Sequence, residues 1–211
     1  MNAHAVTREF EGALCEYTGA RFAVAVNSCT SALLLAVAWH IAAAQPRSRK
    51  GEHIFVTPEV EIPGRTYVSV PMSIIHAGGR VRFRDEEWSG GYQLRPYPIW
   101  DYARRFTSGM FVPGQFQCVS FHAAKILGDT QGGAILHDDP AADAWLRRAR
   151  FDGRREGVAP RDDEFDMVGW HVYLSPDVSA RLLLKLSFLP RVNADLPNDA
   201  YPDLSAMAVF R

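Results

Sequence analysis

The stretch Phe22–Ala44, FAVAVNSCTSALLLAVAWHIAAA, contains a complete strand–turn–helix unit, and most of the chain continues its alternation. Residues 22–26 are an apolar run of strand length, and residues 32–44 are an apolar run of helical length. The polar turn NSCTS between them is typical of a helix N-terminus. The first backbone N–H groups of a helix lack internal partners, and the helix dipole is positive there, so this turn suits a phosphate. Simple capping of the helix by Ser28 or Thr30 is the alternative.

Further segments of strand and helix length alternate on both sides of this unit. Helices are predicted at residues 7–18, 66–76, 141–150 and 177–189, and strands at 53–57, 80–84, 97–100, 116–121 and 133–137. Residues 85–96 predict a loop, a brief helical turn is expected at 102–106, and residues 191–211 give no clear pattern. The alternation predicts an α/β fold with a largely parallel sheet flanked by helices.

A second informative stretch is Cys118–Ala134, CVSFHAAKILGDTQGGA. It contains Lys125, one of only three lysines, in a loop that leaves a predicted strand and is followed by glycines. A lysine in such a loop can form a Schiff base with a carbonyl cofactor if its surroundings lower its pKa, whereas a solvated loop lysine is the alternative. Asp101 and the 27–31 turn also follow predicted strands, so all three are expected to meet at one edge of the sheet.

Length, charge and cysteine content restrict the class of protein and the kinds of partner that the sequence allows. The chain has 211 residues, enough for one sizeable domain, and its net charge of -1 gives no electrostatic case for a nucleic-acid or membrane partner. Its three cysteines are widely spaced and predict neither a metal site nor a disulfide framework, which favours a reducing cytoplasm. The first residues do not resemble a signal peptide, and no apolar run is long enough for a membrane span.

Five motifs, in order, resemble the DegT/DnrJ/EryC1/StrS family of sugar aminotransferases, which are fold-type I enzymes dependent on pyridoxal 5'-phosphate. The resemblance runs from about Phe10 to Pro190. The motifs are FEGALCEYTGARFAVAVNSCTSALLLAV, RTYVSVPMSIIHAGGRVRFRD, WDYARRF, SFHAAK followed by GGAIL, and VGWHVYLSPDVSARLLLKLSFLP. The lysine motif SFHAAK is the most specific of them.

The resemblance implies a pyridoxal-phosphate large domain and a role for individual residues. Lys125 is expected to form the internal aldimine and then to move protons, and Asp101 to face the pyridinium nitrogen. Tyr67 is expected against the cofactor ring, although a partly buried core tyrosine is an equal alternative. The phosphate is expected to be held by Ser28, Cys29, Thr30 and Ser120.

Four positions depart from the family pattern, one of them Tyr173, which stands where the family has arginine. Cys29 stands where the family has glycine, and Arg104 stands where it has glutamine, near the cofactor's phenolic oxygen. A cation at position 104 can stabilise a phenolate or bind a substrate anion; a surface arginine is the alternative. His171 replaces an asparagine that reaches the phosphate of a neighbouring subunit, so a homodimer is expected.

The resemblance also implies a shortened architecture. Residues 1–190 correspond to the large domain, and residues 191–211 form a short tail where the family has a small C-terminal domain. The simplest function that the resemblance implies is an aminotransferase, based on Lys125, Asp101 and the turn that contains Ser28 and Thr30. Such a transferase is expected to act on a small-molecule amine or amino acid in the cytoplasm, with no membrane partner.

Two alternatives remain open at this point. One is a decarboxylase, a lyase that removes an amino-acid carboxylate from a bulky substrate such as a virally hypermodified DNA base. Only this alternative brings in a nucleic-acid partner. The other is a truncated relative without catalytic activity, retained as a binding partner.

Overall fold

In the computed structural model the described residues are 4–44, 57–198 and 201–210. They form five α-helices: α1 (Ala5–Thr18), α2 (Cys29–Ala44), α3 (Ser69–His76), α4 (Pro140–Ala149) and α5 (Pro176–Phe188). The seven strands are β1 (Phe22–Val26), β2 (Glu59–Pro63), β3 (Arg80–Arg84), β4 (Tyr92–Leu94), β5 (Ile99–Asp101), β6 (Phe116–Ser120) and β7 (Gly133–His137). Three short 3₁₀ turns, η1 (Pro160–Asp162), η2 (Leu204–Ala206) and η3 (Ala208–Phe210), complete the list.

Local sequence signals explain several of these boundaries. Gly19 ends α1 in the left-handed conformation with φ of 84°, where its N–H bonds to the Cys15 carbonyl. Asp139 caps α4, because its carboxylate accepts from the backbone N–H groups of Ala141 and Ala142. These are the standard devices that satisfy the unpaired backbone groups of a helix end.

The main sheet has the strand order β1-β7-β6-β5-β4. The α/β class is as predicted, but the pairing is not: only β5 and β6 pair in parallel, whereas the other three neighbouring pairs are antiparallel. Because β7 lies antiparallel between β1 and β6, these two strands point the same way, and β5 points with them. The carboxyl ends of β1, β5 and β6 therefore share one edge of the sheet.

A second, two-stranded sheet pairs β2 with β3 in parallel. Backbone hydrogen bonds between Glu61 and Arg95 connect it to the main sheet beside β4. Neither β2 nor β4 was predicted: β2 follows Pro58, where the sequence indicated a strand end, and β4 lies in the predicted 85–96 loop. The predicted strand at 53–57 lies outside the described residues except for Thr57, which is not in a strand. At 102–106, where a brief helical turn was expected, the chain makes one hydrogen-bonded turn, in which the Arg105 N–H donates to the Tyr102 carbonyl at 3.0 Å.

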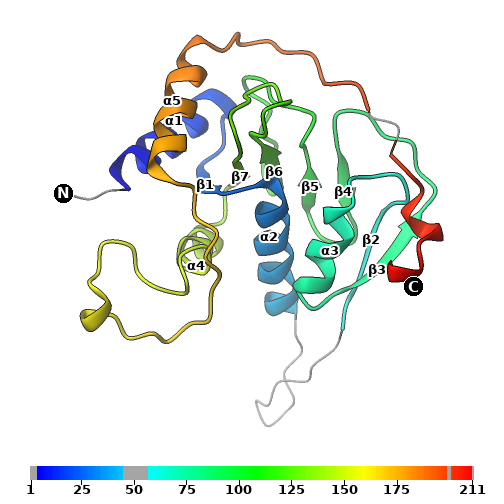
Figure 1. Cartoon of the computed structure of the whole chain (residues 1–211), viewed down its shortest axis with the longest axis horizontal. Helices are drawn as coiled ribbons and strands as arrows, with labels where there is room; N and C mark the ends of the chain where they lie inside the picture. The colour runs from blue at the N-terminus through cyan, green and yellow to red at the C-terminus, as the bar shows by residue number, and fades with distance from the viewer. Residues whose placement is uncertain (1–3, 45–56, 199–200, 211) are drawn as a thin grey trace.

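The helices cover both faces of the main sheet (Figure 1). One hydrophobic cluster joins α2, α3 and α4 to Val24 and Val26 of β1, and a second joins α1 and α5 to Ala23 and Ala25 of the same strand. Alternate residues of a strand point to opposite faces, which explains this division. Helix α2 contributes eight buried residues, in agreement with its continuous apolar sequence.

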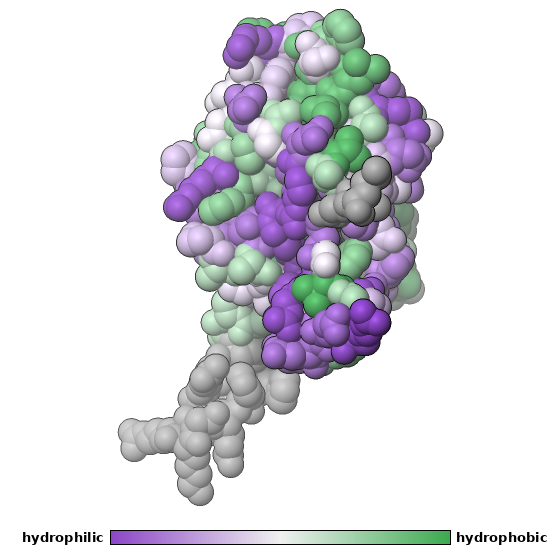
Figure 2. Space-filling view, turned by 90° about the vertical axis from the view of Figure 1, so that its left-hand side faces the viewer, coloured by the Kyte–Doolittle hydropathy of each residue, from purple (hydrophilic) through white to green (hydrophobic). Residues whose placement is uncertain are grey.

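The side of the molecule where α1 and α5 lie, on the left of Figure 1, is mainly hydrophilic, with hydrophobic side chains gathered in its upper part (Figure 2). Leu184 and Phe188 of α5 are exposed hydrophobic side chains. No helix in the described ranges has the length and apolar character needed to cross a bilayer.

The segment after α5 returns along the molecule to the β2–β3 sheet (Figure 1). Its residue Leu204 is fully buried and donates its backbone N–H to the Gly64 carbonyl. Near its end the Phe210 ring contacts Phe83 of β3, with centroids 6.0 Å apart. Tertiary contacts of this kind, which have no local sequence pattern, position the tail.

Candidate functional site

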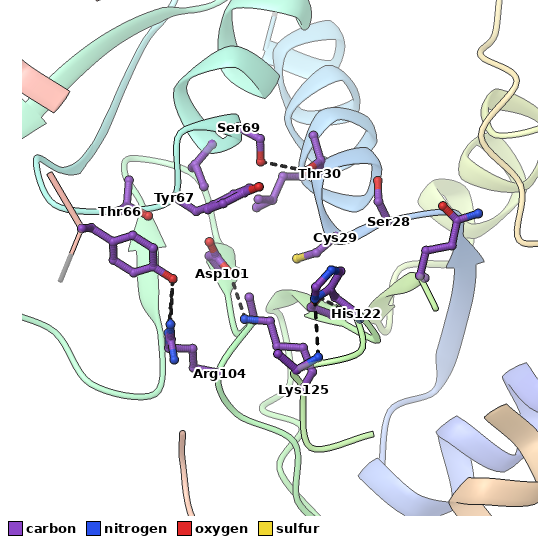
Figure 3. A pocket seen from close by; sticks show the side chains of 18 of the residues that line it. Ser28, Cys29, Thr30, Thr66, Tyr67, Ser69, Asp101, Arg104, His122 and Lys125 are labelled. Carbon is purple, nitrogen blue, oxygen red and sulfur yellow. Dashed lines mark hydrogen bonds between the residues drawn. The ribbon is translucent and has the colours of Figure 1, made fainter. Parts of the chain in front are cut away.

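A cavity of about 460 Å³ lies at the edge where β1, β5 and β6 end. It is lined by all but one of the site residues predicted from the sequence. The site residues that line it are Ser28, Cys29, Thr30, Tyr67, Asp101, Arg104, Ser120 and Lys125. Figure 3 labels all of these side chains except Ser120, and it shows the labelled ones around a common space, with Asp101 and Lys125 between Arg104 on one side and Ser28 on the other. The volume is within the range of small-molecule sites.

One end of the cavity is the N-terminus of α2. The Ser28 hydroxyl accepts a hydrogen bond from the Ser31 backbone N–H at 3.1 Å, so the capping suggested by the sequence is present. The Thr30 hydroxyl bonds to Ser69 of α3 at 2.8 Å. The turn therefore combines hydroxyl groups with the positive end of a helix dipole, a combination that favours an anion.

Gly133 brings β7 unusually close to this turn. A Cβ atom at Gly133 would lie 2.5 Å from the Cys29 nitrogen and 2.6 Å from the Ser28 carbonyl carbon, distances that a real side chain does not adopt. Only glycine allows this approach, so the second glycine of the GG pair shapes the cavity end.

Asp101, the last residue of β5, is a buried carboxylate with 6% of its surface exposed. It accepts hydrogen bonds from the Tyr92 phenol and from the Ala103 backbone N–H, both at 2.9 Å. Burial raises the pKa of Asp101, and the two hydrogen bonds and the charges of Lys125 and Arg104 oppose that rise. The carboxylate thus lies in a cavity with two cationic side chains.

Lys125 is half-buried in the loop after β6, where its backbone N–H donates to the His122 carbonyl at 2.8 Å. Its charge acts on Asp101 and on the Cys29 thiol, whose pKa is raised mainly by burial. The same loop is fastened by Asp129, which pairs with Arg181 at 2.9 Å and Lys185 at 2.7 Å on α5. The sequence interpretation required Lys125 and Asp101 to face one space, and they do (Figure 3).

The tail contributes a wall that sequence reasoning missed. Tyr201 lines the cavity, and its phenol oxygen accepts hydrogen bonds from Arg104 Nε at 3.3 Å and Nη2 at 3.0 Å. Trp88, in the predicted 85–96 loop, stacks on the Tyr201 ring with centroids 6.2 Å apart and an interplanar angle of 16°. Tyr92 was also missed; it does not line the cavity, but its phenol donates a hydrogen bond to the Asp101 carboxylate, which does.

His171 is the predicted site residue that does not line this cavity. It is exposed, and its Nδ1 lies 2.9 Å from an Asp152 carboxylate oxygen. The resemblance assigned His171 to the site of a neighbouring subunit, and that role stays a prediction. Within the described ranges no cluster of three or more His, Cys, Asp or Glu side chains could hold a metal ion.

Comparison with solved structures places the fold. PseC from Helicobacter pylori, an aminotransferase involved in the biosynthesis of pseudoaminic acid, shares 19% identity with a TM-score of 0.69; the match covers 88% of this chain and 58% of PseC. The sugar aminotransferase CalS13 from Micromonospora echinospora shares 18% identity with a TM-score of 0.68, over 87% and 60% of the two chains. DesV from S. venezuelae, solved in complex with a ketimine intermediate, shares 19% identity with a TM-score of 0.64, over 87% and 57%.

This chain thus spans less than two thirds of the length of each of these three proteins. No curated protein sequence matches it. The model of the DegT/DnrJ/EryC1/StrS aminotransferase family matches residues 3–92 and 108–195, and Asp101 and Arg104 lie between the two matched segments. Because these two segments together make up most of the 211-residue sequence, the chain belongs to the DegT/DnrJ/EryC1/StrS aminotransferase family.

Proposed function

We propose that this protein is an aminotransferase dependent on pyridoxal 5'-phosphate, acting on an amine substrate, with Lys125 as the residue that binds the cofactor covalently. Pyridoxal 5'-phosphate is the cofactor of the family to which the chain belongs. The observation that carries the proposal is the shared cavity: Lys125, Asp101 and the N-terminus of α2 line one space of about 460 Å³.

The residues present fit this cofactor. The α2 turn offers hydroxyls and backbone N–H groups to a phosphate through Ser28, Thr30 and the neighbouring Ser120. Asp101 is a buried carboxylate suited to a protonated ring nitrogen, and Tyr67 supplies an aromatic face at the cavity wall. When bound, pyridoxal phosphate supplies an electron sink for carbanion chemistry.

Each side chain then has a defined task. Asp101 holds a proton on the ring nitrogen, and the Tyr92 phenol and Ala103 N–H keep the Asp101 carboxylate charged and oriented. The Lys125 amine moves a proton to and from the substrate carbon that bears the nitrogen. The buried position of these groups strengthens their electrostatic interactions relative to water.

Cofactor binding tests this proposal directly. Purified protein mixed with pyridoxal phosphate is expected to develop a visible absorption band, and borohydride reduction should attach one pyridoxyl phosphate group to the peptide that contains Lys125. Lys50 and Lys185, the two other lysines, are the internal controls because neither should be modified. A protein that stays colourless, or a label that distributes over all three lysines, contradicts the assignment.

Product analysis separates transamination from decarboxylation. The buried Arg104 in the cavity supports a substrate that carries a carboxylate, and such a substrate can lose either its amino group or its carboxylate. Release of a keto acid with exchange of the amino group supports the aminotransferase. Release of carbon dioxide supports the lyase, and neither product from a cofactor-loaded protein supports a non-catalytic relative.

The proposal includes the cytoplasm as the location and a homodimer as the oligomeric state. The homodimer is supported by the exposed position of His171 outside the cavity, together with exposed hydrophobic side chains such as Val168, Leu184 and Phe188. Sedimentation at several protein concentrations measures the oligomeric state. In a dimer with shared sites, His171→Ala should weaken cofactor binding; an active monomer contradicts this part of the proposal.

A further inference from the structure

Two aromatic side chains form the wall of the cavity opposite the α2 turn. Tyr201 and Trp88 both line the cavity, and their rings stack with centroids 6.2 Å apart. The Tyr201 phenol oxygen accepts a hydrogen bond from Arg104 Nη2 at 3.0 Å, and Arg104 lies across the cavity from Ser28 (Figure 3). The stacked rings therefore bound the part of the cavity that is opposite the end suited to a phosphate.

Trp88 is a firm support for the Tyr201 ring. Its indole N–H donates to the Arg65 carbonyl at 2.9 Å, and its ring meets the buried Tyr92 ring edge-on with centroids 4.8 Å apart. Its own carbonyl accepts a hydrogen bond from the Asn198 side-chain amide. A ring that is fixed by hydrogen bonds and packed against a buried neighbour keeps one orientation.

The tail that carries Tyr201 is fastened on both sides of this residue. Before it, Asp195 pairs with Arg105 at 2.6 Å. After it, the fully buried Leu204 donates its backbone N–H to the Gly64 carbonyl at 2.9 Å. Because Tyr201 lies beyond residue 195, where the family match ends, its part of the wall is not part of the matched family pattern.

The space inside this wall is limited. The cavity of about 460 Å³ lies in the lower part of the range of small-molecule sites, roughly 300 to 1,000 Å³. Pyridoxal phosphate, with its ring beside Asp101 and its phosphate at the α2 turn, would take up part of that volume. The remainder suits a compact substrate, since a larger one has to displace packed aromatic rings, which is unfavourable.

We infer that Tyr201, supported by Trp88, sets an upper limit on the size of the substrate, so that the site takes a compact amine and excludes a bulky one. The inference rests on the proposed function and assigns it a substrate class. It opposes the alternative in which the amino-acid group is attached to a bulky substrate such as a modified DNA base. Tyr201 acts here through the bulk of its ring rather than through its hydroxyl group.

The reaction of cofactor-loaded protein with O-alkyl hydroxylamines tests this limit for any natural substrate. Methoxyamine and O-benzylhydroxylamine carry the same reactive nitrogen, which attacks the aldehyde carbon of the bound cofactor, forms an oxime and releases Lys125. Loss of the visible band gives the rate, and free pyridoxal phosphate gives the rate ratio without steric exclusion. Relative to that ratio, the wild-type protein is expected to react with O-benzylhydroxylamine about tenfold or more too slowly.

A graded series at position 201 separates the ring from its hydroxyl group. Tyr201→Phe keeps the ring and should keep this handicap of the larger reagent. Tyr201→Leu should reduce the handicap, and Tyr201→Ala should bring the ratio to within about threefold of that of the free cofactor. Tyr97→Ala is the matched control, because Tyr97 is also half-buried but does not line the cavity, and it should leave the handicap unchanged.

Four results would overturn the inference. They are a wild-type ratio equal to that of the free cofactor, an unchanged ratio in Tyr201→Ala, a loss of the handicap in Tyr201→Phe as large as in Tyr201→Ala, and an equal loss in Tyr97→Ala. With a normal absorption band, each of them refutes the size limit and leaves the proposed function intact. Protein that takes up no cofactor gives no band, which refutes the proposed function and the inference that rests on it.

Discussion

The Tyr92 phenol donates a hydrogen bond of 2.9 Å to the carboxylate of Asp101, and both side chains are buried. The two residues lie opposite each other in the antiparallel pair of β4 and β5. The short strand β4 thus supports the carboxylate that faces the cavity. Its presence depends on pairing with β5 rather than on its own sequence, which is only three residues long.

Tyr92→Phe is expected to weaken cofactor binding at low pH. Loss of the hydrogen bond removes one of the groups that lower the pKa of Asp101, so that pKa rises further, and the carboxylate becomes neutral at a higher pH. The acid limb of cofactor uptake should move to higher pH, and stability should fall by about 1 to 2 kcal/mol. Absorption titrations at several pH values measure the shift. Tyr97→Phe, near His40 at the other end of the sheet, should leave the limb in place.

Gly133→Ala is expected to displace the α2 turn. The added Cβ would collide with the backbone of Ser28 and Cys29, which cannot rotate away as a flexible side chain could. A cost of about 1 to 3 kcal/mol in unfolding free energy is typical of such overpacking, and affinity for pyridoxal phosphate should fall with it. Gly12→Ala is the control, because the space around a Cβ there is open and alanine favours the α1 helix. Equal stability of the two variants would contradict the close approach.

Asp129→Asn should loosen the loop that carries Lys125. Asp129 is buried and paired with Arg181 and Lys185, whose hydrogen bonds lower its pKa. Removing the charge should cost about 1 to 3 kcal/mol in unfolding free energy, because two basic groups lose a partner. Asp177→Asn breaks an exposed pair with the same Arg181, which solvent screens, and should lower the unfolding free energy less than Asp129→Asn does. Chemical denaturation of both variants measures the difference.

His137 and Asp143 should give the protein two opposing responses to acid. Burial lowers the pKa of His137 from 6.5 to about 4 and raises that of Asp143 from 3.8 to about 6. Between pH 6.5 and 4 the unfolded chain protonates at His137 while the folded chain does not, so this residue reduces stability as the pH falls. Between pH 6 and 3.8 the folded chain protonates at Asp143 before the unfolded chain, so this residue increases stability as the pH falls.

Single variants separate the two contributions. From pH 6.5 to 5 the His137 contribution amounts to about 2 kcal/mol of lost stability. On acidification from pH 7 to 5, His137→Phe should therefore lose less stability than the wild type, whereas Asp143→Asn should lose more. Thermal unfolding at each pH gives the slopes, and slopes that depart from the wild type in the same direction in both variants would refute the assignment.

The sequence predicted those parts of the fold whose signals are local. The bounds of β1, β3 and β7 agree with the predicted runs, because each is a short segment of strand-forming residues bounded by turns. The strand β2, EVEIP, follows one proline and ends in another, so it does not have such a pattern, and β4 is set by its partner. The expectation of a largely parallel sheet failed because the direction of β7 is decided by tertiary pairing.

The candidate site was predictable for a similar reason. Ser28 and Lys125 follow β1 and β6, and Asp101 ends β5. These three strands point the same way although β7 separates β1 from β6. These three residues therefore meet at one edge of the sheet, as predicted, although the sheet is not largely parallel. Tyr201 could not be found in this way, because contacts made by Leu204 and Asp195, rather than any periodic pattern, place it at the cavity.

The position of Gly133 has a mechanical consequence. This first residue of β7 is paired with Val26 before the α2 turn and with Ser120 before the lysine loop, so both loops leave the sheet beside the same residue. A local opening of either loop is therefore expected to disturb the other. Amide hydrogen exchange should accordingly report one cooperative unit around both loops, with protection that disappears only when the central strands separate.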